Sequence, residues 1–185
     1  NAMVYGAELE VKKNFAFINE KLEGLSVGAN FTYILSRVNT KDIEVDADGT
    51  TEYDLRQANA RNGETVKGFR PMQGQAPYLV NAFINYSNDS IGLEANLSYN
   101  VQGKRLAIVG SGIVPDVYED PFHSLNFKIS YAFGKTDNMK LSFSAQNLLE
   151  DSFKQFYESY EAKNQIYRSY TNGRSFSLGF NYKFF

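Results

Sequence analysis

The residues that usually carry catalysis are scarce in this sequence. His123 is the only histidine, and there is no cysteine. A Cys–His pair is therefore impossible, and a zinc site could use at most one imidazole. His123 stands between Phe122 and Ser124 at the expected start of a strand, so we interpret it as an interfacial strand residue. We expect no catalytic residue, no enzymatic activity and no cofactor.

One acidic segment has a pattern that could bind a metal ion. Residues 44–49 place oxygen-bearing side chains at alternate positions before Gly49, as calcium loops do. The first position is Glu44, however, and the twelfth would be Leu55 where a calcium loop requires glutamate. We therefore interpret this segment as a solvated acidic loop and predict no metal site.

Several cations in or near the expected loops could bind an anionic ligand, because guanidinium groups clamp carboxylates and phosphates. They are Arg56, Arg61, Arg70, Lys104 and Arg105. Asn100 and Gln102, on the polar face of an expected strand, could line a substrate path. The alternatives are ordinary solvated charges and side chains that simply fill a lumen. The candidate ligand-binding residues are Arg70, Asn100, Gln102, Lys104 and Arg105.

The composition favours strands as the elements that position these residues. Aromatic residues make up 15% of the 185 residues, with 13 Tyr, 15 Phe and no Trp, and Gly outnumbers Pro by 14 to 4. The net charge of −2 does not favour a nucleic-acid partner. Mean hydropathy is −0.41. That value does not exclude membrane strands, whose alternating faces average out.

The dominant signal is alternation of apolar and polar residues, which is typical of strands with one apolar face. It is clearest in the segment from Ile91 to Gln102. The other apolar faces run over 7–11, 25–33, 78–86, 125–133, 139–145 and 176–184. We therefore predict an all-β chain of about seven long strands in an antiparallel up-and-down meander. A helical turn is expected only within 53–62.

The expected connections alternate between short and long. Short turns fall at 88–90 and 134–138, with a somewhat longer link at 13–24. Long polar stretches occupy 38–77, 110–121 and 150–173. Outer-membrane barrels have this arrangement, with short periplasmic turns and long extracellular loops. If the C-terminus is periplasmic, every connection falls on the expected side.

Two architectures explain such strands: a membrane barrel and a soluble sandwich, in which the apolar faces point inward. Strands of about 9–11 residues suit a tilted bilayer crossing, whereas strands in soluble proteins are usually about 5–6 residues long. The apolar faces carry no charge and have aromatic residues near their ends, as in the aromatic girdles of membrane barrels. Both observations favour the membrane barrel.

The last residues resemble the C-terminal assembly signal of outer-membrane proteins, which the barrel-insertion machinery reads. Its matching positions are Gly179, Tyr182, Phe184 and Phe185. An ordinary edge strand is the alternative reading of these residues.

Further segments resemble the TonB-dependent receptors in order and spacing. They are 70–81 (RPMQGQAPYLVN), Tyr99-Asn100 with Gly103-Lys104-Arg105, Pro115-Asp116 with Tyr118-Glu119, 146–149 (QNLL) with Asp151, and 173–179 (GRSFSLG). The resemblance implies a barrel of about 22 strands around a plug. This chain would then form its last third, over residues 4–185, with residues 1–3 a tag scar and chain start.

What the resemblance implies for function is uptake of a scarce nutrient, such as an iron chelate (siderophore), cobalamin or a glycan, across the outer membrane of a Gram-negative bacterium. The partners would be outer-membrane lipid, the barrel-insertion machinery, the small-molecule nutrient, and TonB through an N-terminal part that this chain lacks. We expect the isolated piece to close on itself or to self-associate through its two open edge strands. The alternatives are a complete small barrel with a structural, adhesion or pore role, and a soluble β-barrel or sandwich ligand binder. An enzymatic barrel fits least, given the single histidine.

Overall fold

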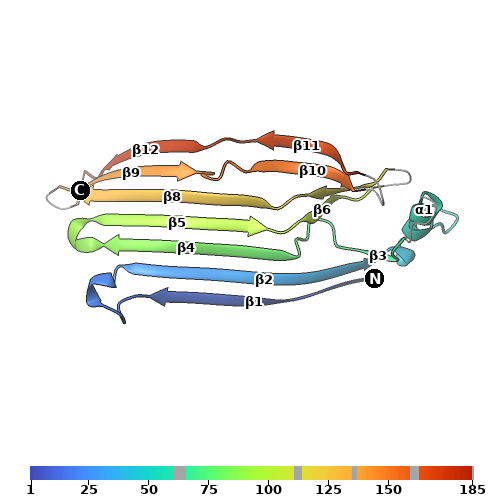
Figure 1. The fold of residues 1–185 in the computed structure, drawn as a ribbon, viewed down its shortest axis with the longest axis horizontal. Helices are drawn as coiled ribbons and strands as arrows, with labels where there is room; N and C mark the ends of the chain where they lie inside the picture. Colours follow the sequence, from blue (N-terminus) through green and yellow to red (C-terminus); the bar gives the residue numbers. More distant parts are fainter. Residues whose placement is uncertain (61–65, 111–113, 135–136, 159–162, 185) are drawn as a thin grey trace.

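The computed structural model of the chain describes residues 1–60, 66–110, 114–134, 137–158 and 163–184. Its main sheet has eight antiparallel strands in the order β1-β2-β4-β5-β8-β9-β12, with β3 paired to β2 (Figure 1). These strands are β1 (Ala2–Asn14), β2 (Leu25–Asn39), β3 (Phe69–Arg70), β4 (Tyr78–Asn88), β5 (Leu93–Gln102), β8 (Phe122–Phe133), β9 (Met139–Gln146) and β12 (Ser175–Tyr182).

A second, smaller sheet lies beyond one end of the main sheet (Figure 1). It has four strands in the order β11-β10-β7-β6. They are β6 (Arg105–Ile108), β7 (Asp116–Glu119), β10 (Ser152–Glu158) and β11 (Gln165–Thr171). The helical elements are α1 (Glu52–Ala58) and the 3-10 turns η1 (Glu20–Leu22), η2 (Thr40–Asp42) and η3 (Asp89–Ile91). None of the helices within the described ranges has the length and apolar character to cross a bilayer.

The predicted fold class is confirmed: the chain is all-β, and its main sheet is an up-and-down meander. The seven strands of the meander correspond to the seven apolar–polar segments of the sequence. β1 is longer than expected, because its pairing with β2 extends from Asn14 back to Ala2. Ala2 and Met3, which belong to the predicted tag scar and chain start, pair with Val38 and Arg37.

Strand register joins the separate apolar faces into one surface. Leu97 of β5 lies opposite Ile84 of β4 and Phe127 of β8. Phe143 of β9 lies opposite Ile129 and Leu178. Because residues directly opposite each other point to the same side of a sheet, the apolar side chains form a continuous band from β1 to β12. We call this side the outer face.

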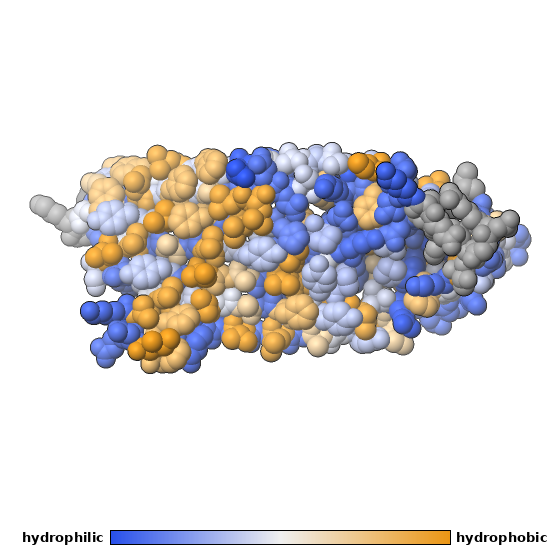
Figure 2. Space-filling model, viewed as in Figure 1, coloured by the Kyte–Doolittle hydropathy of each residue, from blue (hydrophilic) through white to orange (hydrophobic). Residues whose placement is uncertain are grey.

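The outer face is not covered by another layer within the described part of the chain. Leu178 and Phe180 keep 74% and 63% of their surface exposed, and Figure 2 shows apolar side chains gathered over the main sheet. The chain exposes 12414 Å², whereas a compact protein of this mass exposes about 9,000 Å². A soluble sandwich would bury these faces, so the structure disagrees with that alternative.

The opposite side, which we call the inner face, is polar and hydrogen-bonded across strands. Asn100 donates to Asn81 at 2.6 Å, and the hydroxyls of Ser144 and Ser177 are 2.6 Å apart. Lys140 pairs with Glu94 at 2.7 Å. Cross-strand polar pairs of this kind suit a wet surface, so the two sides of the sheet are adapted to different surroundings.

The short and long connections segregate to opposite ends of the main sheet. The β1–β2, β4–β5 and β8–β9 turns lie at the same end as the C-terminus (Figure 1). The long connections, which contain α1 and the second sheet, lie at the other end. We call these the turn end and the loop end.

Two of the long connections contain more regular structure than predicted. Residues 110–121 and 150–173 were expected to be loops, but they contain β7, β10 and β11. In β10, Phe153 and Tyr157 point to one side of the strand and Phe156 points to the other. The sequence of this strand therefore shows no single apolar face. The pairing of β10 with β11 also shifts register between Gln155 and Phe156. The predicted helical turn within 53–62 is present as α1, over 52–58.

Candidate functional site

Two long connections meet through an ion-pair cluster at the loop end. The Arg56 guanidinium on α1 binds the Asp116 carboxylate on β7 through two hydrogen bonds, at 2.8 and 2.9 Å. Glu52, also on α1, accepts from Arg56 Nε at 2.9 Å and from Arg70 Nε at 2.8 Å. We call Glu52, Arg56, Arg70 and Asp116 the loop latch.

Local sequence positions the α1 half of this latch. Thr51 and Asp54 form a capping box that starts the helix. The hydroxyl and backbone N–H of Thr51 donate to the Asp54 carboxylate, which lowers the pKa of Asp54 below its usual 3.8. Glu52 and Arg56 are four residues apart, so they lie on one side of the helix and pair directly.

The latch is largely removed from water. Glu52 is 7% and Asp116 is 8% exposed, and the backbone N–H of Gly110 also donates to Asp116 at 2.8 Å. Burial alone would lower the pKa of Arg56, but its hydrogen bonds to Asp116 and the charges of Asp116 and Glu52 outweigh that effect and raise it. Arg56 therefore stays charged at every physiological pH.

A second polar cluster surrounds Glu119 of β7. This carboxylate, only 4% exposed, accepts from Arg105 at 2.7 Å, from Gln155 at 3.0 Å and from Gln102 at 3.4 Å. These three donors come from β6, β10 and the end of β5, so the cluster joins the second sheet to the main sheet. Its acceptors are already engaged by the chain's own donors.

Lys104 lies between two aromatic rings beside a carboxylate. Its ammonium forms an ion pair with Glu158 and lies 4.8 Å from the ring centre of Tyr118 and 4.9 Å from that of Phe156. A cation over aromatic faces is stabilised by the ring quadrupoles. The three side chains that hold Lys104 all come from the second sheet.

The cations predicted to bind ligand are therefore placed in internal ion pairs. Arg70 joins Glu52, Lys104 joins Glu158 and Arg105 joins Glu119. Arg56 is also paired, and Arg61 lies outside the described residues. Asn100 bonds Asn81, on the inner face as predicted. The sequence offered no signal for the carboxylate partners, which lie up to 60 residues away.

A polar hollow of about 670 Å³ lies on the inner face, near the loop end of β8, β9 and β12. Amide and hydroxyl side chains dominate its lining: Asn96, Ser124, Asn126, Ser144, Gln146 and Asn172. Asn147 connects its walls, because its backbone N–H donates to Asn126 at 3.0 Å and its amide donates to the Gly173 carbonyl at 2.8 Å. Gln146 and Asn147 drew attention in the sequence only as part of the family resemblance, and none of the residues that line the hollow was predicted to bind a ligand.

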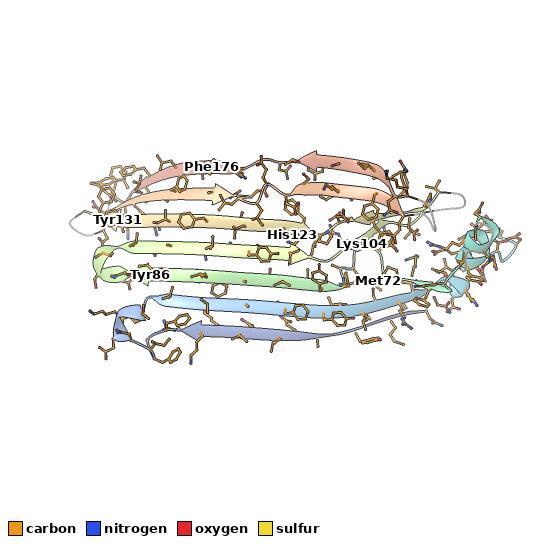
Figure 3. All side chains as sticks on the ribbon, viewed as in Figure 1. Met72, Tyr86, Lys104, His123, Tyr131 and Phe176 are labelled. Atoms are coloured by element: carbon orange, nitrogen blue, oxygen red, sulfur yellow. The ribbon has the colours of Figure 1, made fainter. Side chains whose placement is uncertain are left out.

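His123 occupies the outer face near the loop end of β8 (Figure 3). Its Nδ1 lies 2.7 Å from the Tyr99 hydroxyl, and its backbone N–H donates to Asp151 at 2.8 Å. Tyr99 and His123 thus form a polar pair at the loop-end border of the apolar band.

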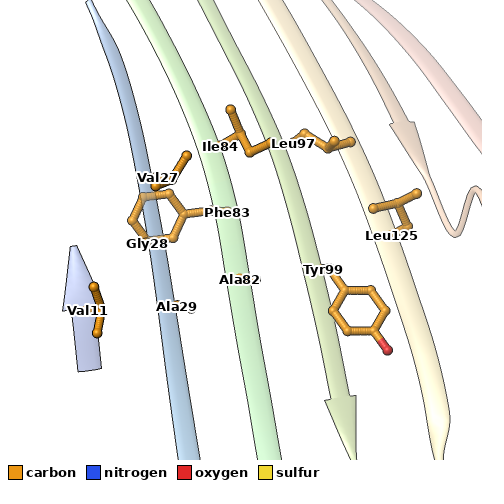
Figure 4. A pocket seen from close by; sticks show the side chains of 10 residues that line it. All are labelled: Val11, Val27, Gly28, Ala29, Ala82, Phe83, Ile84, Leu97, Tyr99 and Leu125. Atoms are coloured by element: carbon orange, nitrogen blue, oxygen red, sulfur yellow. The ribbon is translucent and has the colours of Figure 1, made fainter. Parts of the chain in front are cut away.

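The middle of the outer face has a shallow apolar hollow of about 330 Å³. It lies where two small residues, Ala29 and Ala82, are opposite each other on β2 and β4. Figure 4 shows the larger side chains of Val27, Ile84 and Leu97 around them. None of the described residues that line the hollow is charged, so it suits hydrocarbon.

The acidic segment 44–49 folds into a tight hairpin. Val45 N–H donates to the Thr50 carbonyl at 2.8 Å, and Gly49 turns the chain with φ of +87°. The Asp48 carboxylate accepts from Thr50, which lowers its pKa. Within the described ranges, no three His, Cys, Asp or Glu side chains gather closely enough to hold a metal ion.

The residues of the predicted assembly signal lie on the C-terminal strand and just beyond it. Gly179 is on the inner face of β12, where its carbonyl accepts from Ser142 at 3.3 Å. Tyr182 and Phe184 meet edge to face at the turn end, and Phe184 is 73% exposed. Phe185 lies outside the described residues.

In a comparison with known families, residues 1–148 match the family described as TonB dependent receptor-like, beta-barrel. The matched range covers β1 through β9, so it includes the outer band and the polar inner face except for the parts on β12. No curated protein and no solved structure matches the chain. Because the match spans well over half of the 185 residues, the chain belongs to the TonB-dependent receptor-like β-barrel family.

Proposed function

We propose that the chain forms part of the wall of an outer-membrane TonB-dependent receptor, which takes up a scarce nutrient in a Gram-negative bacterium. The observation that carries the proposal is the continuous apolar outer face, exposed from β1 to β12 and opposed by a polar inner face. Family membership supports a role in transport.

The height of the apolar band supports placement in a bilayer. On β2, the outer face is apolar from Leu25 to Leu35 and becomes charged at Arg37. At about 3.4 Å per residue this segment is about 34 Å long, or about 26 Å high at a typical tilt of about 40°. That height is close to the apolar band of about 25 Å found in outer-membrane barrels.

Aromatic side chains mark both borders of the band. Tyr86, Tyr131 and Tyr182 lie toward the turn end, and Figure 3 shows the first two there. Tyr33 and Tyr78 are paired toward the loop end. Phenol rings prefer the membrane–water interface, so the two rows define the expected depth of the sheet.

The orientation follows from the connections. In outer-membrane barrels the short turns are periplasmic and the long loops extracellular. The loop latch and the Glu119 cluster would then brace the extracellular surface. TonB would be reached through an N-terminal part of the receptor, and the barrel-insertion machinery would read β12.

Site-directed spin labelling tests this proposal without background, because the chain has no cysteine. Ile84 and Asn85 are neighbours on β4 that point to opposite faces, so Ile84→Cys and Asn85→Cys are matched controls. In lipid vesicles, a label at 84 should be more accessible to oxygen than to a water-soluble nickel chelate. A label at 85 should show the reverse. Equal or inverted accessibilities would contradict a lipid-facing outer side.

A further inference from the structure

The inner-face hollow has the chemistry of a ligand site, and this inference rests on the proposed function. We propose that it binds an uncharged, hydroxyl-rich ligand of the carbohydrate type rather than an anionic chelate. The hollow lies on the inner face next to the loop end of β8, β9 and β12, the end from which a nutrient would enter between the loops.

The lining matches hydroxyl groups because it offers donors and acceptors together. Gln146 and Asn172 are exposed, and neither amide group forms a hydrogen bond with another described side chain. Each primary amide carries two N–H donors and one carbonyl acceptor, and each serine hydroxyl both donates and accepts. A sugar hydroxyl also donates and accepts, so it can form a hydrogen bond with either the donors or the acceptors of this lining.

Two further features of the lining support the same class of ligand. Phe122 lies on the inner face opposite Gln102 and contributes an aromatic surface, which suits the apolar face of a sugar ring. The Asn147 Oδ1 is buried and has no hydrogen-bond partner among the described residues. A hydroxyl donor reaching this oxygen would remove the cost of leaving it unpaired.

The charges argue against an anionic ligand. Lys128 is the one charged residue among the described residues that line the hollow, and it interacts electrostatically with Glu94 on the neighbouring strand. The loop-end cations that the sequence offered as anion ligands, Arg70, Lys104 and Arg105, are each paired with a carboxylate. Strong binding of a carboxylate or phosphate normally uses free guanidinium or ammonium groups.

Nuclear magnetic resonance of the detergent-solubilised chain, labelled with ¹⁵N in its Asn and Gln side chains, gives the direct test. The probes are neutral α- and β-linked glucan tetrasaccharides and gallium citrate, a diamagnetic anionic chelate. A tetrasaccharide should shift the side-chain amide signals of Gln146 and Asn172. The signals of Asn81 and Asn100, on the same face but outside the hollow, should not move.

Paired variants check the position of the site. Gln146→Ala with Asn172→Ala should weaken tetrasaccharide binding about thirtyfold, through the loss of two hydrogen bonds worth about 1 kcal/mol each. Asn81→Ala with Asn100→Ala, the matched control, should leave it unchanged. Binding of gallium citrate instead, binding of neither probe, or equal effects of the two double variants would overturn the inference. The spin labels at 84 and 85 report on membrane placement independently of these results.

Discussion

Arg56 and Asp116 lie 60 residues apart in sequence, yet they form a two-point ion pair at 2.8 and 2.9 Å between α1 and β7. Arg56→Ala would leave Asp116 as a buried carboxylate without its cation, whereas Glu52 would keep its ion pair with Arg70. Removing one partner of a buried pair typically costs about 3–5 kcal/mol. We predict a loss of about 3 kcal/mol in the local stability of α1, seen as faster hydrogen exchange of the Leu55 and Asn59 amides.

Arg37→Ala is the control for that variant. This substitution also removes an arginine near the loop end, but one whose guanidinium lies over an aromatic ring, 4.6 Å from the ring centre of Phe69. It should leave exchange in α1 close to that of the unmodified chain. If both variants changed α1 equally, the latch would not be the interaction that holds the helix.

The Arg105–Glu119 ion pair should stabilise the second sheet. Arg105→Ala should destabilise the second sheet, because it leaves a carboxylate that is only 4% exposed without its cation. Adding Glu119→Gln should restore most of that stability, since the neutral amide can still bond Gln102 and Gln155. Thermal unfolding of both single variants and the double variant measures the coupling. Additive losses would show that Arg105 acts independently of Glu119.

The start of α1 should respond to acid. The hydrogen bonds from Thr51 lower the pKa of Asp54 below 3.8 in the folded chain. A lowered pKa means that the stabilisation is fully present above 3.8 and is lost as the pH falls through the lower folded value. The Thr51 amide resonance should therefore stay constant from neutral pH to about pH 5 and shift only in stronger acid. Asp54→Asn should abolish this shift, and its persistence in that variant would assign it to another group.

The two edge strands of the main sheet, β1 and β12, predict self-association. Among the described residues, β1 pairs only with β2 and β12 only with β9, so each has one side free. Such edges pair readily with other strands. At high protein concentration, alternate amides of β1 and β12 should become protected from hydrogen exchange, whereas amides of β4 and β5 should not change. Fast exchange at both edges at every concentration would contradict edge pairing.

The main sheet was predictable because its signal is local. The alternation within 125–133 and within 139–145 identifies each apolar face without knowledge of its partner, and the register then places Tyr131 opposite Leu141 as that pattern requires. The small sheet lacked this signal, since the aromatic residues of β10 fall on both of its sides. Its strands depend on pairing with distant segments.

The candidate site was less predictable than the fold. The sequence showed Arg70 and Arg105 as cations near loops, but not that Glu52 and Glu119 would neutralise them. Ion pairing at the loop end depends on how two long connections meet, which no spacing along the chain specifies. The inner hollow is similar, because Asn126, Gln146 and Asn172 come from three separate segments.

The mass of the purified chain with and without mild detergent, measured by sedimentation, tests the lipid-facing outer side most directly. With Leu178 and Phe180 more than half exposed, we predict that the chain requires detergent to remain dispersed and carries a large amount of it. A stable monomer that needs no detergent and binds none would contradict the account, because the outer face would then have to be buried within the protein.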